Sequence, residues 1–186
     1  MSAMATRAVP HPLAQLPNAL TIGRLALIPV FIGLMLAAEG GHSWLAAVVF
    51  GVAGVTDQVD GWLARRWRVE SEFGKVADPL ADRLMIDTAV VLLWLADRLP
   101  WPALAVVAAR DLLLLGGYKL VVPRGYDLSV NFLGKVATWV LYASIGAVLV
   151  THAGDDWPLW FFWAGVGLAL AAAAVYVASV LGMRRR

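Results

Sequence analysis

Six apolar stretches, each close to the length that crosses a lipid bilayer, constrain this chain more than any other feature. Glycine, proline and charged residues delimit them at 18–38, 44–63, 76–95, 102–122, 132–151 and 157–182. A membrane-spanning helix needs about 20 predominantly apolar residues. Apolar residues make up 61% of the 186 residues, far more than in soluble domains. We therefore predict an all-α integral membrane protein of one domain with six transmembrane helices.

The charges of the connections predict the orientation of these helices. The first, third and fifth connections, around Glu39, Asp97 and Asp155, carry acidic residues, two histidines and a single arginine, Arg98. Positive residues occupy both termini and the second and fourth connections, and positive charge favours the cytoplasmic side. These are Arg7, Arg65, Arg66, Arg68, Lys119, Arg124 and Arg184 to Arg186. We expect a multi-pass protein of the cell (inner) membrane with both termini in the cytoplasm.

The same punctuation divides the chain into three parts. Residues 1–16 are expected to form a short cytoplasmic segment, 17–183 the six-helix domain, and 184–186 a basic cytoplasmic tail. Pro10, Pro12 and Gln15 delay the first apolar stretch, which is not the pattern of a cleaved signal peptide. The chain has no cysteine, so a thiolate metal site and disulfide bonds are excluded.

Four carboxylates interrupt or flank the second and third apolar stretches. Asp57 and Asp60 are three residues apart, and Asp78 and Asp82 are four apart, so on helices the members of each pair share a face. A charge at the centre of a membrane helix costs roughly 2.5–3.5 kcal/mol on insertion scales, so the carboxylates need a cation. Hard divalent ions such as Mg²⁺ prefer such oxygen ligands, and two acidic pairs are suited to two ions.

Two other interpretations of these carboxylates remain open. An acidic pair with this spacing is common on a solvated helix face, so one pair alone is weak evidence. Carboxylates inside a membrane also mark ion paths, which makes an intramembrane cation carrier an alternative function. A carrier would need polar groups that continue into the outer halves of the spans, and those halves contain mainly Leu, Val, Ala and Trp.

The acidic pairs belong to a longer motif that resembles a known family. Asp57, Asp60, Gly61, Ala64, Arg65, Gly74, Asp78 and Asp82 match the signature D-x2-D-G-x2-A-R-x8-G-x3-D-x3-D with every gap correct. This is the signature of the CDP-alcohol phosphotransferases, also called CDP-alcohol phosphatidyltransferases. The resemblance implies a six-helix membrane enzyme of phospholipid synthesis with a polar active-site cavity that faces the cytoplasm. Such an enzyme transfers a substituted phosphoryl group from a CDP-linked donor to an alcohol and releases CMP.

The resemblance also assigns roles to the motif residues. It implies that two Mg²⁺ or Mn²⁺ ions are held by Asp57, Asp60, Asp78 and Asp82, and that Asp82 is the general base on the acceptor hydroxyl. It further implies a site for the cytidine diphosphate of the donor. That site would comprise Asp57, Gly61, Ala64, Arg65 and Gly74. The plain alternatives are helix packing for the glycines and a positive-inside anchor for Arg65.

Basic residues inside other spans resemble further positions of the family. Asn18 and Arg24 match a P-N-x-x-T-x-x-R start, and Arg24 is a candidate for binding the donor diphosphate. Arg110 and Lys135 stand where relatives that use glycerol phosphate carry R-E and G-K, which makes them candidates for the acceptor phosphate. The alternative for Arg110 is an ion pair with Asp111 or Asp87. Asp87 matches no position of the family.

The motif favours a glycerol-based acceptor. The run from Asp78 to Arg83 resembles phosphatidylglycerophosphate synthases, whereas Val130 to Thr138 resembles actinobacterial-type cardiolipin synthases. The expected partners are therefore CDP-diacylglycerol, an acceptor of the glycerol-phosphate type and membrane lipids, with no nucleic acid. Cardiolipin synthesis from phosphatidylglycerol is the alternative function. The resemblance is compatible with a homodimer.

Overall fold

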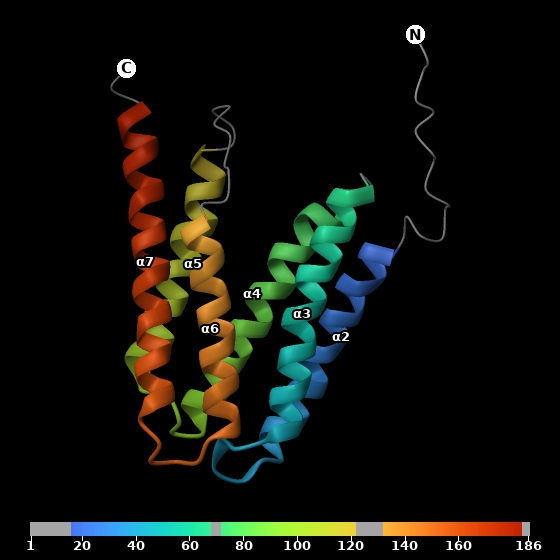
Figure 1. Ribbon diagram of the computed structural model, residues 1–186, viewed down its shortest axis with the longest axis vertical. Helices are drawn as coiled ribbons and strands as arrows, with labels where there is room; N and C mark the ends of the chain where they lie inside the picture. The colour runs from blue at the N-terminus through green and yellow to red at the C-terminus, as the bar shows by residue number, and fades with distance from the viewer. Residues whose placement is uncertain (1–15, 68–71, 122–131, 184–186) are drawn as a thin grey trace.

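The computed structural model describes residues 16–67, 72–121 and 132–183, and these are helical apart from short connections (Figure 1). The predicted all-α class is confirmed for this part of the chain. Its elements are α2 (Leu16–Leu36), the short 3-10 helix η1 (Glu39–Gly41), α3 (Trp44–Trp67), α4 (Glu72–Leu95), α5 (Trp101–Val121), α6 (Phe132–Val150) and α7 (Trp157–Met183).

The helix bounds agree with the predicted stretches except on either side of residues 68–71. Helices α3 and α7 begin at the predicted Trp44 and Trp157, and α4 ends at the predicted Leu95. Helix α3 continues to Trp67, however, and α4 already begins at Glu72. The arginines that were assigned to the connection are good helix formers, so their charge marks the edge of the apolar stretch and not the end of the helix.

The helices form two groups that approach each other at one end of the molecule (Figure 1). Helices α2, α3 and α4 pack together, α6 packs along α7, and contacts between α3 and α6 and between α4 and α5 join the groups. The α2–α3, α4–α5 and α6–α7 connections all lie at one end, here called the connection end. The opposite end, where α3 ends and α4 begins, is called the signature end.

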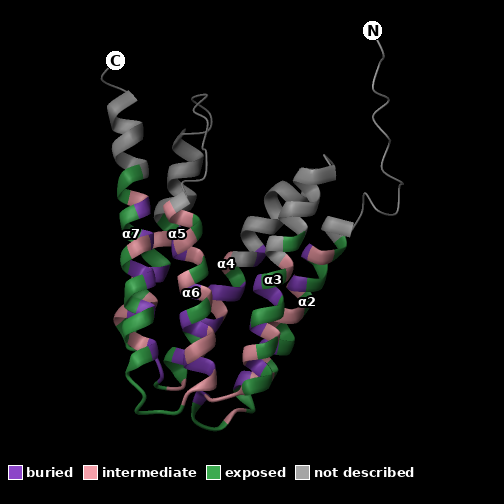
Figure 2. Cartoon of the chain, viewed as in Figure 1, coloured by how far each residue is buried: buried purple, intermediate pink, exposed green. Residues whose placement is uncertain are grey.

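The buried residues lie between the helices (Figure 2), and many large apolar side chains are exposed on the outside of the described bundle. Phe31, Phe50, Leu93 and Phe162 are completely or almost completely buried, whereas Leu36 is exposed. Four tryptophans, Trp44, Trp101, Trp157 and Trp160, are exposed near the starts of α3, α5 and α7. Such a ring of tryptophans at one end is typical of a membrane interface.

Three of the described helices are long and apolar enough to cross a membrane. The qualifying segments are Ala19–Leu36 in α2, Leu133–Val150 in α6 and Trp157–Val175 in α7. In α3 a shorter apolar segment, Trp44–Thr56, precedes the acidic motif. The structure thus agrees with a membrane protein, and the prediction of six spans goes beyond what these three helices establish.

Arg98 ties the connections together at the connection end. Its Nη2 atom donates hydrogen bonds to the carbonyl oxygen of Val148 (3.0 Å) and to Oγ1 of Thr151 (3.3 Å). Its Nη1 atom donates to the carbonyl oxygen of Gly40 at 3.5 Å. Burial lowers the pKa of Arg98, and the carboxylate of Asp155 opposes this shift. One guanidinium group therefore joins the α4–α5 connection to the end of α6 and to η1.

Candidate active site

The motif residues lie on two helices that meet at the signature end. Asp57, Asp60, Gly61, Ala64 and Arg65 belong to the last turns of α3, and Gly74, Asp78 and Asp82 to the first half of α4. Each acidic pair thus lies within one continuous helix, as the argument from spacing requires. The side chains of these eight residues lie outside the described residues, so their roles remain predictions.

The backbone arrangement is compatible with the divalent metal ions that the motif implies. Helices α3 and α4 are in contact, and α2 packs against both. The candidate ligands, Asp57, Asp60, Asp78 and Asp82, are all carboxylates, which are the hard oxygen donors that Mg²⁺ and Mn²⁺ prefer. They are distributed over two adjoining helices at the same end of the bundle. The donor set therefore fits the ions.

Arg24 is buried on α2, the helix that packs against both motif helices. Its side chain is only 1% exposed, and Thr21, one turn earlier on α2, is fully buried. A guanidinium group carries its charge at any physiological pH, so its burial in a bundle requires anionic or hydrogen-bonding neighbours. The burial of Arg24 is compatible with the predicted contact to the donor diphosphate, which stays a prediction. The side chain of Asn18 lies outside the described residues.

A cluster of four charged side chains occupies the interface between α4 and α5. Nη1 of Arg83 and Nη1 of Arg110 lie 3.7 and 3.8 Å from the same carboxylate oxygen, Oδ1 of Asp111. Nη1 of Arg83 also donates a hydrogen bond to the backbone oxygen of Asp111 at 3.3 Å. The side chain of Asp87 faces that of Asp111. We call Arg83, Asp87, Arg110 and Asp111 the charge cluster.

The charge cluster was only partly anticipated from the sequence. Pairing of Arg110 with Asp111 was one of the two alternatives for Arg110, and the structure shows this contact. The participation of Arg83 was missed, and Asp87 was anticipated only as an alternative partner of Arg110. The spacing of Arg83 and Asp87, four residues apart, was an available signal because it places both on one face of α4.

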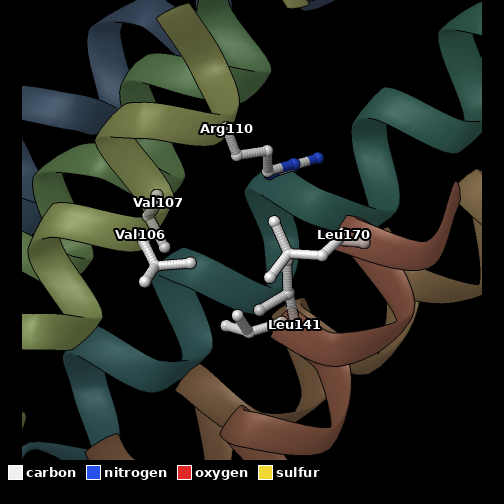
Figure 3. A pocket seen from close by; sticks show the side chains of 7 residues that line it. Val106, Val107, Arg110, Leu141 and Leu170 are labelled. Carbon is white, nitrogen blue, oxygen red and sulfur yellow. The ribbon is translucent and has the colours of Figure 1, made fainter. Parts of the chain in front are cut away.

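Lys135 and Arg110, the two predicted acceptor residues, lie on different helices, α6 and α5. Lys135 is exposed in the first turn of α6. Arg110 extends from α5 into the space between the helices, beyond the apolar side chains of Val106 and Val107 (Figure 3). It closes one end of a narrow apolar crevice that is completed by Leu141, Val166, Ala169 and Leu170. Among the described residues, no hydrogen bond or ion pair joins the two predicted acceptor residues.

A polar cavity of about 220 Å³ lies far from the motif, at the connection end. Arg98, His152, Asp155 and Asp156 contribute to its lining. The imidazole rings of His42 and His152 stack beside it, with centroids 4.2 Å apart. Because the acidic motif lies at the opposite end of the bundle, we do not assign the phosphate chemistry to this cavity.

An apolar helical bundle with paired carboxylates at one end is typical of membrane proteins that bind divalent cations, and metal-dependent enzymes that act on lipid phosphate esters are one such class. The chain belongs to the CDP-alcohol phosphatidyltransferase family, whose model matches residues 14–179. It is therefore a transferase of phospholipid biosynthesis, and the family is generally dependent on divalent metal ions. The resemblance that the motif carries is thus confirmed over nearly the whole chain.

Relatives that are named for two different activities are similar to this chain. The CDP-diacylglycerol–glycerol-3-phosphate 3-phosphatidyltransferase of Bacillus subtilis is 34% identical over 147 residues, which cover 73% of this chain and 76% of the relative. The Escherichia coli protein of the same name is 31% identical over 172 residues, which cover 89% of this chain and 91% of the relative. The CMP-forming cardiolipin synthase of Streptomyces coelicolor is 38% identical over 157 residues, which cover 82% of this chain and 72% of the relative.

Proposed function

We propose that this enzyme transfers the phosphatidyl group of CDP-diacylglycerol to glycerol 3-phosphate, which yields phosphatidylglycerophosphate and CMP. The observation that carries the proposal is the complete acidic motif on α3 and α4, within a family match that spans residues 14–179. Two relatives named for this activity, from Bacillus subtilis and Escherichia coli, support the choice of acceptor.

The proposed topology has six spans, with the signature end and both termini in the cytoplasm. In support, α2 begins and α7 ends at the signature end, and exposed tryptophans gather at the opposite end (Figure 1). A reporter fused after Arg186 should be cytoplasmic. A cysteine at Gly154 should react with an impermeant reagent outside intact cells, whereas one at Arg66 should be protected. Labelling at Arg66 would place the active site on the outside and contradict the topology.

The acidic motif would hold the donor and the metal ions. Divalent ions bound by Asp57, Asp60, Asp78 and Asp82 would neutralise diphosphate charge and stabilise the departing CMP. Gly61, Ala64, Arg65 and Gly74 would line the cytidine diphosphate site, where a residue without Cβ lets the ligand approach the backbone. Asn18 and Arg24 would contact the donor diphosphate. In support, Arg24 is buried on a helix that packs against both motif helices.

Asp82 would accept the proton of the acceptor hydroxyl while that oxygen attacks the phosphorus of the donor. A general base within hydrogen-bonding reach contributes about 10²–10⁴-fold to such a step. We favour direct attack over a covalent enzyme intermediate because no histidine belongs to the motif. The described histidines, His42 and His152, stack at the connection end.

Arg110 and Lys135 would bind the phosphate of the acceptor. Both carry positive charge inside or beside apolar spans, and charge-assisted hydrogen bonds to phosphate are among the stronger polar contacts. Arg110 is largely buried, with its side chain 15% exposed, so its charge is better shielded from water than that of the exposed Lys135.

Cardiolipin synthesis from phosphatidylglycerol is the second candidate, because the Streptomyces coelicolor relative named for that activity is 38% identical. The deciding experiment offers labelled CDP-diacylglycerol to the purified enzyme with either glycerol 3-phosphate or phosphatidylglycerol and separates the products by thin-layer chromatography. A product with glycerol 3-phosphate alone supports the proposal. A product with phosphatidylglycerol alone would replace it with the second candidate.

A further inference from the structure

Two arginines from neighbouring helices converge on one buried carboxylate in the charge cluster. Arg83 of α4 and Arg110 of α5 both approach Oδ1 of Asp111, at 3.7 and 3.8 Å. The two approaching nitrogens are thus no farther apart than the sum of these distances. A phosphate group can receive hydrogen bonds from two guanidinium groups separated in this way, since its oxygens point in several directions.

The contacts of these arginines with Asp111 are not those of a closed ion pair. Both distances exceed the 2.7–2.9 Å or so of a charge-assisted N–H···O bond. Neither carboxylate oxygen of Asp111 accepts a hydrogen bond from Arg83 or Arg110, although both oxygens are buried, and the neighbouring hydrogen-bonding side chain is that of Asp87. A buried carboxylate that lacks hydrogen bonds from its cationic neighbours destabilises the folded state. An ion pair that served stability alone would be expected to close, so the structure favours a role in which the guanidinium groups exchange this partner for another anion.

The exposure of the three side chains is ordered as such an exchange requires. The side chain of Arg83 is 25% exposed and that of Arg110 is 15% exposed, whereas that of Asp111 is 10% exposed. An anion can therefore approach the guanidinium groups while the carboxylate stays covered. With Asp87 beside Asp111, the cluster contains two acidic and two basic side chains, so its formal charge is balanced before a ligand binds.

We propose that Arg83 is a second guanidinium ligand of the acceptor phosphate, together with Arg110. The carboxylate of Asp111 is then an internal counter-ion that occupies both guanidinium groups until the phosphate of the acceptor replaces it. This inference rests on the proposed function and narrows the acceptor to a water-soluble phosphomonoester. Such a group carries a charge of about −1.5 to −2 near neutral pH, which matches several cations better than the single charge of a phosphodiester.

The position of Arg83 in the chain suits a short acceptor. Arg83 directly follows Asp82, the proposed general base, on α4. Consecutive residues of an α-helix project about 100° apart, so the two positions lie within one helical turn but on different faces of α4. Glycerol 3-phosphate has its attacking hydroxyl three carbons from its phosphate ester, which suits two groups that lie at the same level of one helix.

Steady-state kinetics of the full-length enzyme tests the inference, with glycerol 3-phosphate and CDP-diacylglycerol varied in turn. Arg83→Gln should raise the KM for glycerol 3-phosphate by about tenfold or more, the scale of one lost charge-assisted contact, and change the KM for CDP-diacylglycerol by less than about twofold. Arg83→Lys keeps the charge but not the planar fork and should lie between Arg83→Gln and the wild type.

The direction in which Asp111→Asn changes the KM for glycerol 3-phosphate is the decisive test. This substitution removes the internal anion that competes with phosphate, so the KM for glycerol 3-phosphate should fall severalfold, by about three- to tenfold, since competition between two anions for one site is relieved. If Asp111 only stabilises the fold, the same substitution should raise that KM or lower the melting temperature without improving binding. Melting curves with and without glycerol 3-phosphate, recorded without donor, give a readout that does not need turnover.

Each outcome separates this inference from the proposed function. If the wild-type enzyme uses glycerol 3-phosphate but Arg83→Gln leaves its KM unchanged, or if Asp111→Asn raises that KM, the inference is wrong and the proposed function stands. An equal rise in both KM values for Arg83→Gln would assign Arg83 to general packing and also overturn the inference. A wild-type enzyme that accepts only phosphatidylglycerol would overturn both.

Discussion

Buried arginines at the two ends of the bundle differ in how fully their hydrogen-bonding groups are used. At the connection end, Arg98 donates hydrogen bonds to Gly40, Val148 and Thr151, which belong to two other connections or helix ends. Toward the signature end, Arg83 and Arg110 stay beyond hydrogen-bonding distance of the Asp111 carboxylate. Arg98 thus makes three hydrogen bonds that link separate segments and hold the fold together. Among the described residues Arg83 makes one, to the backbone oxygen of Asp111, which leaves further guanidinium donors for a ligand.

The conformation of the backbone supports the same contrast. At the connection end, Gly40, Gly41 and Gly154 adopt positive φ angles, and Asp97 has a φ of 57°. A Cβ atom at Gly41 would lie 2.7 Å from the Cβ atom of Ala96, so this turn is fitted closely to the start of the α4–α5 connection. The connection end is thus built for a fixed shape, and the two helix groups separate from it toward the signature end (Figure 1).

The largest effect should come from the motif at the signature end. Asp57→Asn, Asp60→Asn and Asp78→Asn should each lower turnover by at least about 100-fold, the scale of losing electrostatic stabilisation in a transition state. The melting temperature should not fall, because these carboxylates serve chemistry and repel one another. CMP release and thermal unfolding of the same preparations measure the two quantities. Turnover that persists in EDTA would contradict the metal-dependent role.

Arg98 should show the opposite pattern, with loss of stability and retention of chemistry. Arg98→Met removes three hydrogen bonds from a charged donor, and such bonds contribute about 1.5–3 kcal/mol each before relaxation. We expect a destabilisation of about 2–4 kcal/mol in all, because water reaches part of this end, and an unchanged KM for both substrates in the folded fraction. Arg98→Lys is the matched control and should recover part of the stability. A selective change in one KM would show that the connection end takes part in substrate binding.

Lys135 should affect one substrate only and by less than the motif. Lys135→Ala should raise the KM for the acceptor by about tenfold with little change in the KM for CDP-diacylglycerol, because it removes a contact that serves one substrate. Asp82→Asn is the contrasting variant, since loss of the base should act mainly on kcat. Equal effects of Lys135→Ala on both KM values, or none on either, would return Lys135 to an anchor at the membrane surface.

The sequence predicts the fold well wherever the pattern is local. Apolar stretches and their punctuation locate α7 from Trp157 and the end of α4 at Leu95, because crossing a bilayer requires a fixed number of apolar residues. The placement of Asp57 and Asp60 on one helix, and of Asp78 and Asp82 on the next, follows from the same pattern. The end of α3 was harder to predict, because the arginines there lower the hydropathy of the segment without ending the helix.

Contacts between distant residues could not be predicted from that pattern. The bond from Arg98 to Val148 joins residues 50 positions apart, and the contact of Arg83 with Asp111 spans 28 positions. Both contacts depend on which helices pack side by side. The apolar periodicity of a single sequence does not give this information. Asp87 matches no position of the motif. Its role could not be predicted from local sequence because its neighbour Asp111 lies on another helix.

The smallest expected effect tests how closely α6 and α7 pack between the two ends. A Cβ atom at Gly165 would lie 3.2 Å from the backbone nitrogen of Leu141 and 3.1 Å from Cγ1 of Val140. At Gly167, two residues further along α7, it would meet nothing within 4 Å. Alanine is favoured over glycine inside a helix by about 1 kcal/mol. Gly167→Ala should therefore raise the melting temperature slightly.

Gly165→Ala brings the same gain in helix propensity but forces the new methyl group against backbone that cannot rotate away. Overpacking of this kind typically costs about 1–3 kcal/mol, so we expect a net loss of about 1 kcal/mol. Thermal unfolding of the two variants in the same detergent measures the difference, and activity should be retained in both. If Gly165→Ala stabilises the protein as much as Gly167→Ala does, then α6 and α7 separate readily, and the signature end is not the only part of the bundle that is loosely held.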